Sequence, residues 1–255
     1  MTSQRFDFTG AQGQRLAGRL EIPAGSLRGA ALFAHCFACG KDVFAASRLA
    51  DGLTARAVAV LRFDFTGLGA SEGEFGNGGF SANIADLIAA AGAMREAGLA
   101  PTLLIGHSLG GAAVLATAGA IPETRAVVTI GAPFEARHVL ELFKDQLPTI
   151  EAEGAAEIRL GGRAFKIDRA FVNDVRRHGS TDHIAELRRA LLVMHAPGDA
   201  IVGIDNAARI FERARHPKSF VSLDDADHLL SRRSDAEYVA GVIVAWAARY
   251  LPTAP

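Results

Sequence analysis

A serine flanked by glycines carries the chemistry that this sequence most strongly suggests. The string Gly106-His107-Ser108-Leu109-Gly110 lies between an apolar run at 102–105 and an alanine-rich run at 111–120. This pattern is typical of a sharp turn from a strand into a helix, with a strained central residue and glycines that allow close packing. We expect the Ser108 hydroxyl to project at a helix N-terminus, where developing negative charge is favoured.

A serine hydroxyl becomes a useful nucleophile when a histidine accepts its proton and a carboxylate orients that histidine. In open, mostly parallel sheets the reactive groups lie at the carboxyl ends of the strands. Asp199 follows an apolar run at 191–194, and His228 follows another at 219–223. We therefore predict an acyl-transfer site of Ser108, His228 as base and Asp199 as orienting acid. Taken singly, Ser108 could instead form an anion-binding turn and Asp199 could cap a helix.

An acyl-transfer site also needs two donors for the oxyanion that forms when the serine attacks a carbonyl. The backbone N–H of Leu109 follows the nucleophile and is the first candidate. The second is expected from the loop at 34–40, where we assign the backbone N–H of Phe37. We expect His35 in the same loop to be structural and to bond within that loop.

Short apolar runs alternate with helical segments, which predicts a mostly parallel sheet with helices on both faces. An antiparallel hairpin is expected first, from residues 5–9 and 15–22. Asp42 and Ser81 are the expected N-caps of helices at 43–56 and 81–97. The further expected strands lie at 30–34, 58–63, 102–105, 126–130, 191–194 and 219–223, and the further helices at 111–120, around 206–213 and at 235–250.

The alternation breaks between about residues 134 and 189, where we expect three helical pieces and a small hairpin of residues 158–160 and 164–167. We predict one domain over residues 1–255, with residues 134–189 inserted between two sheet strands. Phe134, Phe143 and Phe171 could line an apolar substrate pocket there. Together with Phe165, these aromatic side chains could instead form a small core of the insertion itself, which is the more common role of aromatic residues in an insertion.

Composition narrows the classes of partner. The chain has 255 residues, 49% of them hydrophobic, and a net charge of −1, so no basic excess favours nucleic acid or an anionic membrane. Its first residues lack the apolar core of a signal peptide, and no apolar run approaches the roughly 20 residues that span a bilayer. We expect a cytoplasmic protein acting on a small, largely neutral molecule.

Cys36 and Cys39 form the chain's one C-x-x-C pair. Such a pair can be redox-active, or it can lie in a loop whose function resides in its backbone. A structural zinc site would need a second pair of ligands at matching spacing, and none is visible. We therefore expect no metal and no cofactor.

Together these motifs resemble the α/β-hydrolase superfamily over essentially the whole chain. The order Ser108, Asp199, His228 is that of the superfamily. The string at 62–71, RFDFTGLGAS, is similar to its D-x-x-G-x-G-x-S loop, with Asp64 and Ser71 usually structural. The segments HCFACGKD, LVMHAPGDAIVGIDNA and SFVSLDDADHLL are similar to the hydrolase half of bacterial α/β-hydrolase/OsmC fusion proteins. Because this chain ends soon after its last helix, we expect any OsmC-like partner to be absent or separate.

The resemblance implies an eight-stranded, mostly parallel sheet with a small lid at 134–189, and a carboxylesterase-type serine hydrolase acting on small esters. Amides and thioesters stay open, because the same residues serve all three. The alternatives are a peroxide-linked or redox-associated hydrolase using Cys36 and Cys39 or an OsmC-like protein, and a ligand-binding protein without catalysis. A homodimer is a further partner that the sequence leaves open.

Overall fold

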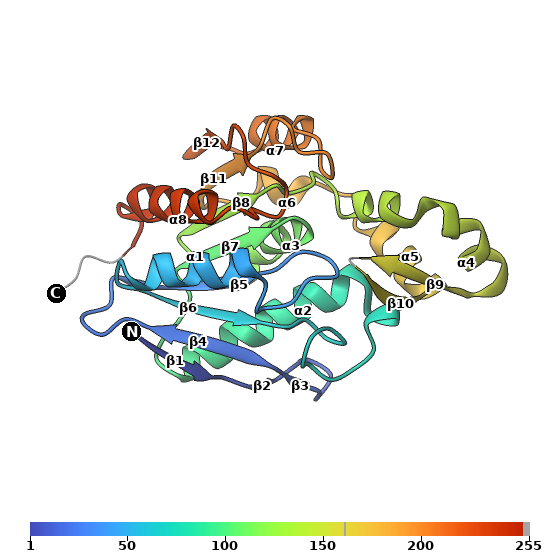
Figure 1. Cartoon of the computed structure of the whole chain (residues 1–255), viewed down its shortest axis with the longest axis horizontal. Coiled ribbons are helices and arrows are strands. Elements are labelled where there is room, and N and C mark those ends of the chain that lie inside the picture. Colours follow the sequence, from blue (N-terminus) through green and yellow to red (C-terminus); the bar gives the residue numbers. More distant parts are fainter. Residues whose placement is uncertain (161, 252–255) are drawn as a thin grey trace.

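An eight-stranded sheet forms the centre of the computed structural model, which describes residues 1–160 and 162–251 (Figure 1). The strands, in their order across the sheet, are β1 (Thr2–Arg5), β4 (Gly18–Ile22), β6 (Val58–Phe63), β5 (Gly29–Ala34), β7 (Leu103–His107), β8 (Ala126–Ile130), β11 (Ala190–His195) and β12 (Lys218–Ser222). β4 is antiparallel to both β1 and β6, and every neighbouring pair from β6 to β12 is parallel. The expected fold class, a mostly parallel sheet of eight strands, is confirmed.

The N-terminal hairpin is divided into two antiparallel pairs. β1 pairs with β4 as the first strands of the main sheet, whereas β2 (Phe8–Thr9) and β3 (Arg15–Leu16) form a small separate ladder. The expected antiparallel pairing is therefore present.

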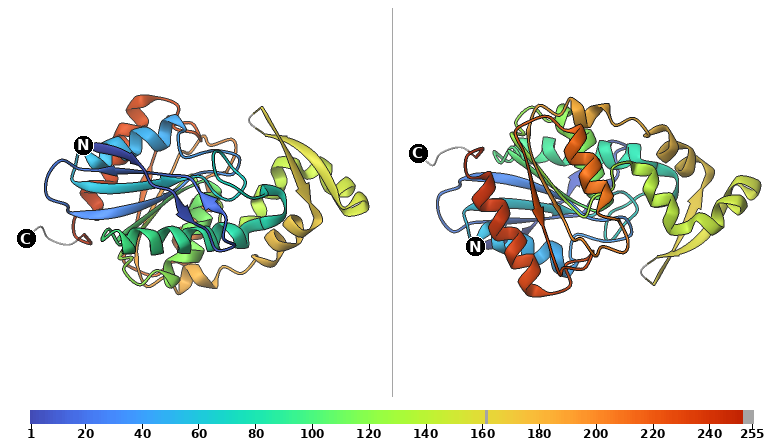
Figure 2. Two further views of the ribbon diagram at one scale, coloured as in Figure 1. Left: turned by 90° about the horizontal axis from the view of Figure 1, so that it is seen from below. Right: turned by 90° about the horizontal axis from the view of Figure 1, so that it is seen from above.

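Helices cover both faces of the sheet (Figure 2). α1 (Phe44–Thr54) and α8 (Arg233–Ala247) pack on one face, and α2 (Phe75–Glu96), α3 (Leu109–Thr117) and α7 (Asp205–Arg213) on the other. Successive residues of a strand point to opposite faces, so Leu32 joins the core under α2 and α3 while Phe33 joins the core under α1 and α8. A short 3₁₀ turn, η1 (Ala118–Ala120), ends α3.

Two expected helix caps are wrong. α1 begins after Val43, with no side-chain cap, and the Asp42 carboxylate instead accepts a hydrogen bond from Lys41 Nζ at 2.6 Å. α2 begins at Phe75 and breaks at Gly79, whose φ is 62°. The hydroxyl of Ser81 donates to Asp174 Oδ1 at 2.6 Å, so both expected caps have partners elsewhere.

Most of the segment between β8 and β11 lies beyond one end of the sheet, on the right of Figure 1, whereas its last helix lies beside α3. The segment contains η2 (Ala136–Gln146), α4 (Leu147–Glu153), β9 (Ala155–Leu160), β10 (Arg163–Asp168), α5 (Arg169–Arg177) and α6 (Asp182–Ala185). The expected hairpin is confirmed, because β9 and β10 pair antiparallel. Gly161 in its turn lies outside the described residues. We call residues 134–189 the insertion.

Candidate active site

The turn from β7 into α3 is as tight as its sequence indicates. Ser108 has φ 55° and ψ −126°, a conformation that residues other than glycine rarely adopt. A Cβ on Gly106 would lie 2.2 Å from the Gly110 carbonyl oxygen, and one on Gly110 would lie 2.4 Å from that of Ala34. Both positions therefore require glycine. The Ser108 N–H donates to the Ile130 carbonyl at 2.9 Å and fixes the turn to β8.

The structure brings Ser108, His228 and Asp199 into one hydrogen-bonded chain. His228 Nε2 lies 3.1 Å from Ser108 Oγ, and His228 Nδ1 lies 2.7 Å from Asp199 Oδ2. The three residues come from loops after β7, β12 and β11, which end at the same edge of the sheet. Ser108 is 9% exposed, so this residue lies close to the protein surface rather than deep in the core.

Asp199 is held as an ionised acceptor by backbone donors. Its Oδ1 accepts the N–H groups of Ile201 and Val202, each at 2.9 Å, which leaves Oδ2 for His228. Burial is the largest influence on the Asp199 pKa and raises it. The hydrogen bonds from His228, Val202 and Ile201 together outweigh burial and lower the pKa below its ordinary value. The carboxylate can therefore orient the imidazole of His228 and stabilise its protonated form.

His195 supports the loop that carries this carboxylate, a role the sequence did not indicate. Its side chain is fully buried, and Nε2 donates to the Val202 carbonyl at 2.7 Å. Nε2 also lies 3.6 Å from Asp199 Oδ2. Because a carbonyl only accepts, the Val202 contact places the proton of a neutral ring on Nε2. The loop from β11 to Val202 is thus closed around Asp199.

His107, the second residue of the glycine-flanked string, holds the backbone of His228. Its Nε2 donates to the His228 carbonyl at 2.6 Å, and the two rings are 5.1 Å apart. The pKa of His107 is lowered from 6.5 to about 4, mainly by burial and to a smaller extent by the neighbouring His228. His107 therefore stays neutral at neutral pH and presents a fixed N–H donor.

This lowered pKa predicts acid sensitivity that replacement of His107 by glutamine should reduce. As the pH falls from 6.5 towards 4, the unfolded chain binds a proton that the folded protein excludes, so the parent loses stability. The loss approaches about 1.4 kcal/mol of unfolding free energy for each pH unit in that window. The glutamine amide can donate to His228 without titrating. Urea unfolding of both proteins between pH 4 and pH 8 measures the difference, and parallel pH profiles would contradict it.

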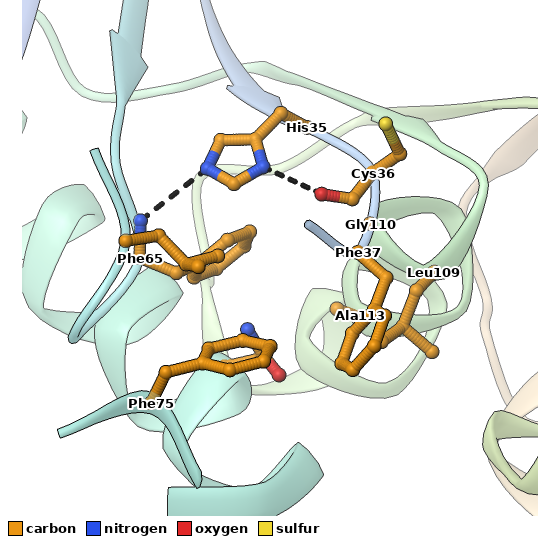
Figure 3. Close-up of a pocket in the computed structure, with 10 residues that line it drawn as sticks. His35, Cys36, Phe37, Phe65, Phe75, Leu109, Gly110 and Ala113 are labelled. Carbon is orange, nitrogen blue, oxygen red and sulfur yellow. Dashed lines mark hydrogen bonds between the residues drawn. The ribbon is translucent and has the colours of Figure 1, made fainter. Parts of the chain in front are cut away.

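The loop after β5 brings Phe37 beside the nucleophile turn. Phe37 and Leu109 line the same narrow cavity, of about 10 Å³, together with Phe75 and Ala113 (Figure 3). Leu109 is the first residue of α3, where the backbone N–H has no partner within the helix. The structure thus places the two residues of the predicted oxyanion donors beside one cavity, and their donor role stays a prediction.

His35 is structural in this loop, as expected. Its Nδ1 donates to the Cys36 carbonyl at 2.7 Å, and its Nε2 accepts the Phe65 N–H at 3.4 Å (Figure 3). Both ring nitrogens are therefore used by the backbone, and burial lowers the pKa of His35. The ring joins the ends of β5 and β6.

Two of the three phenylalanines expected at a pocket reach the Phe37 loop. The Phe171 ring lies 5.7 Å from the ring of Phe37, and the Phe143 ring lies 6.4 Å from both. Phe75 joins them at 5.0 Å from Phe37, so the rings form a core between the insertion and the main sheet. Phe134 lies apart, with the Arg209 guanidinium 4.2 Å above its ring. Phe165 packs on Phe75 at 5.2 Å.

The two cysteines are joined to each other. A disulfide links Cys36 and Cys39, whose Cα atoms are 5.3 Å apart. Within residues 1–160 and 162–251, no group of three or more His, Cys, Asp or Glu side chains is placed to hold a metal ion. In the same part of the chain, no helix combines the length and apolar character needed to cross a membrane.

Comparisons with known proteins agree with the observed fold. Residues 31–242 match the alpha/beta hydrolase family. The structure is similar to the esterase domain of a protein from Rhodothermus marinus, with 46% identity, 98% of this chain and 99% of that chain covered, and a TM-score of 0.79. It also resembles Est1E from Butyrivibrio proteoclasticus with bound ferulic acid (17% identity, coverage 97% and 98%, TM-score 0.74). A serine hydrolase without a lid from Xanthomonas campestris matches at 19% identity, coverage 100% and 98%, and TM-score 0.70. These two distant similarities concern the fold alone. A search of curated proteins found no match.

Proposed function

The chain belongs to the alpha/beta hydrolase family, and from that premise we propose that it is a serine carboxylesterase acting on small esters. The hydrogen-bonded chain from Asp199 through His228 to Ser108 carries this proposal. The choice of an ester bond is supported by the esterase domain from Rhodothermus marinus, which is 46% identical over 98% of this chain.

In the proposed reaction, Ser108 Oγ attacks the ester carbonyl while His228 Nε2 accepts the hydroxyl proton. The backbone N–H groups of Phe37 and Leu109 stabilise the oxyanion. His228 then gives the proton to the departing alcohol, which leaves an acyl group on Ser108. Water, deprotonated by His228, attacks the acyl-enzyme and releases the acid. Asp199 orients the imidazole throughout and stabilises its protonated form.

The insertion is proposed as a lid that limits the size of the acyl group. Phe143 and Phe171 from the insertion pack against Phe37 and are themselves buried. The cavity beside the proposed oxyanion donors is only about 10 Å³, close to the space one water molecule needs. On this ground we propose that the preferred acyl chain is short.

Hydrolysis of p-nitrophenyl esters from acetate to decanoate tests the proposal. We expect kcat/KM for acetate or butyrate to exceed that for decanoate by about tenfold or more, since each methylene without space costs binding in the transition state. Phe171→Ala should shift the preference towards longer chains. Phe134→Ala is the matched control and should leave it unchanged, because Phe134 lies outside the aromatic core. The fastest hydrolysis at decanoate would contradict the assigned chain length, and no hydrolysis of any ester would contradict the function.

A further inference from the structure

Cys36 and Cys39 flank Phe37, the residue whose backbone N–H is the proposed second oxyanion donor, and a disulfide joins them. We propose that this pair is a reversible thiol–disulfide modification site that reacts with dithiols and sets the position of the Phe37 N–H. The disulfide form is then the more active hydrolase. This inference rests on the function proposed above, because it assigns a control point to the same site.

The disulfide closes a turn whose backbone conformation is unfavourable for the alanine at its third position. The Cys39 N–H donates to the Cys36 carbonyl at 3.2 Å, which places Phe37 and Ala38 at the centre of a four-residue turn. Ala38 has φ 45°, in the left-handed region where such turns favour glycine. The bridge joins the two ends of this turn and so opposes the return of Ala38 to negative φ. Opening the bridge removes that covalent restraint.

Both flanks of the turn are fixed, which confines any change to the turn itself. On one side the His35 ring donates to the Cys36 carbonyl at 2.7 Å. On the other side Asp64 Oδ1 accepts the Lys41 N–H at 2.6 Å. A change at Ala38 therefore moves the few residues between these anchors, and Phe37 is the one that faces the cavity beside Leu109 (Figure 3).

The position of the pair suits exchange rather than stabilisation of the whole fold. The cysteines are only three residues apart, and the stabilisation that a disulfide gives by restricting the unfolded chain is smaller for a shorter loop. Cys39 is half-buried, whereas Cys36 is 7% exposed. An incoming thiol thus reaches the Cys39 sulfur more readily, and Cys36 is the leaving group.

Reduction proceeds by two exchanges. A thiolate of the dithiol attacks Cys39 Sγ, which forms a mixed disulfide and breaks the bond to Cys36 Sγ; Cys36 leaves as a thiolate and takes up a proton. The second thiolate of the reductant attacks the reductant's other sulfur, which is bonded to Cys39 Sγ in the mixed disulfide. This step releases Cys39 as a thiolate, which takes up a proton, and closes the cyclic oxidised reductant. Two electrons pass from the dithiol to the protein. Oxidised glutathione reverses the reaction and yields two reduced glutathione molecules.

The test compares the 255-residue chain before and after treatment with dithiothreitol, with the reductant removed anaerobically before p-nitrophenyl acetate is added. Thiol titration should rise from zero to two per chain. We expect kcat to fall about tenfold or more with a smaller change in KM, because an oxyanion donor acts mainly in the transition state. Oxidised glutathione should restore kcat.

Two variants separate control of the donor from general loosening of the loop. The double variant Cys36→Ser, Cys39→Ser should show the low kcat of the reduced parent and no response to dithiothreitol. Ala38→Gly should keep most of its kcat when reduced, because glycine adopts the left-handed conformation without the bridge. If reduction acted only by making the loop less rigid, reduced Ala38→Gly should lose more activity than the reduced parent.

Equal kcat in both redox states, with titration showing zero and two thiols, would overturn the modification site and leave the hydrolase intact. Two free thiols that oxidised glutathione fails to join would also overturn it. If neither redox state hydrolysed the ester and a fluorophosphonate probe labelled Ser108 in neither, the proposed function would fail, and this inference would fail with it.

Discussion

Replacement of Ser108 by alanine is expected to lower kcat for p-nitrophenyl acetate by about 10⁴-fold or more, because nucleophile, base and acid act as a unit. Alanine removes the oxygen that lies 3.1 Å from His228 Nε2 and leaves the rest of the site in place. KM should change much less than kcat. Any residual rate reflects the oxyanion donors and substrate binding, which do not depend on the hydroxyl.

A fluorophosphonate probe gives a second measure of the same assignment. It should label the parent at Ser108 and leave Ser108→Ala unlabelled. Ser234→Ala, at an exposed position near the start of α8, is the matched control and should retain both labelling and kcat. Parental rates in Ser108→Ala would assign hydrolysis to another residue. A folded parent that resists the probe would favour a ligand-binding protein without catalysis.

The central strands of the sheet could be predicted from sequence because they are buried on both faces. Continuous apolar runs bounded by glycine and polar residues mark such strands, and the expected ranges at 58–63 and 126–130 coincide with β6 and β8. The strand ends in turn place the loops that follow them. This is why Ser108, Asp199 and His228 could be expected to meet, and the structure brings them within hydrogen-bonding distance. Their catalytic roles stay predictions until the variants are measured.

The contacts that support the site have no local signal in the sequence. His107 bonds to the carbonyl of a residue 121 positions away, and the Ser81 hydroxyl turns to Asp174 rather than to its own helix. Pattern also could not distinguish Phe134, which packs under Arg209, from Phe143 and Phe171, which reach Phe37. The contacts of each side chain depend on which groups lie near it in the folded chain, and a single sequence does not show those distances.

A buried ion pair is another feature without a sequence signal, and it carries the second large expected effect. Arg62 on β6 and Glu21 on β4 lie on neighbouring strands, with Arg62 Nη2 2.6 Å from Glu21 Oε1 and side-chain exposures of 5% and 2%. Arg62 also donates to the Lys41 carbonyl and to Ser47 Oγ, which ties the start of α1 to the sheet. Arg62→Met should lower the free energy of unfolding by about 3–5 kcal/mol, because it leaves a buried carboxylate without its cation.

Urea unfolding at pH 7 measures this loss, and two further variants identify its cause. The double variant Glu21→Met, Arg62→Met should recover most of the stability, since two packed apolar side chains replace a pair whose desolvation is itself costly. Arg233→Met breaks an exposed pair with Glu237 and should leave the unfolding midpoint unchanged. If the double variant were as unstable as Arg62→Met, the loss of stability would come from the missing hydrogen bonds to Lys41 and Ser47 rather than from the buried carboxylate left without its cation. Stability in the single variant equal to the parent's would contradict the expected cost of a buried carboxylate without its cation.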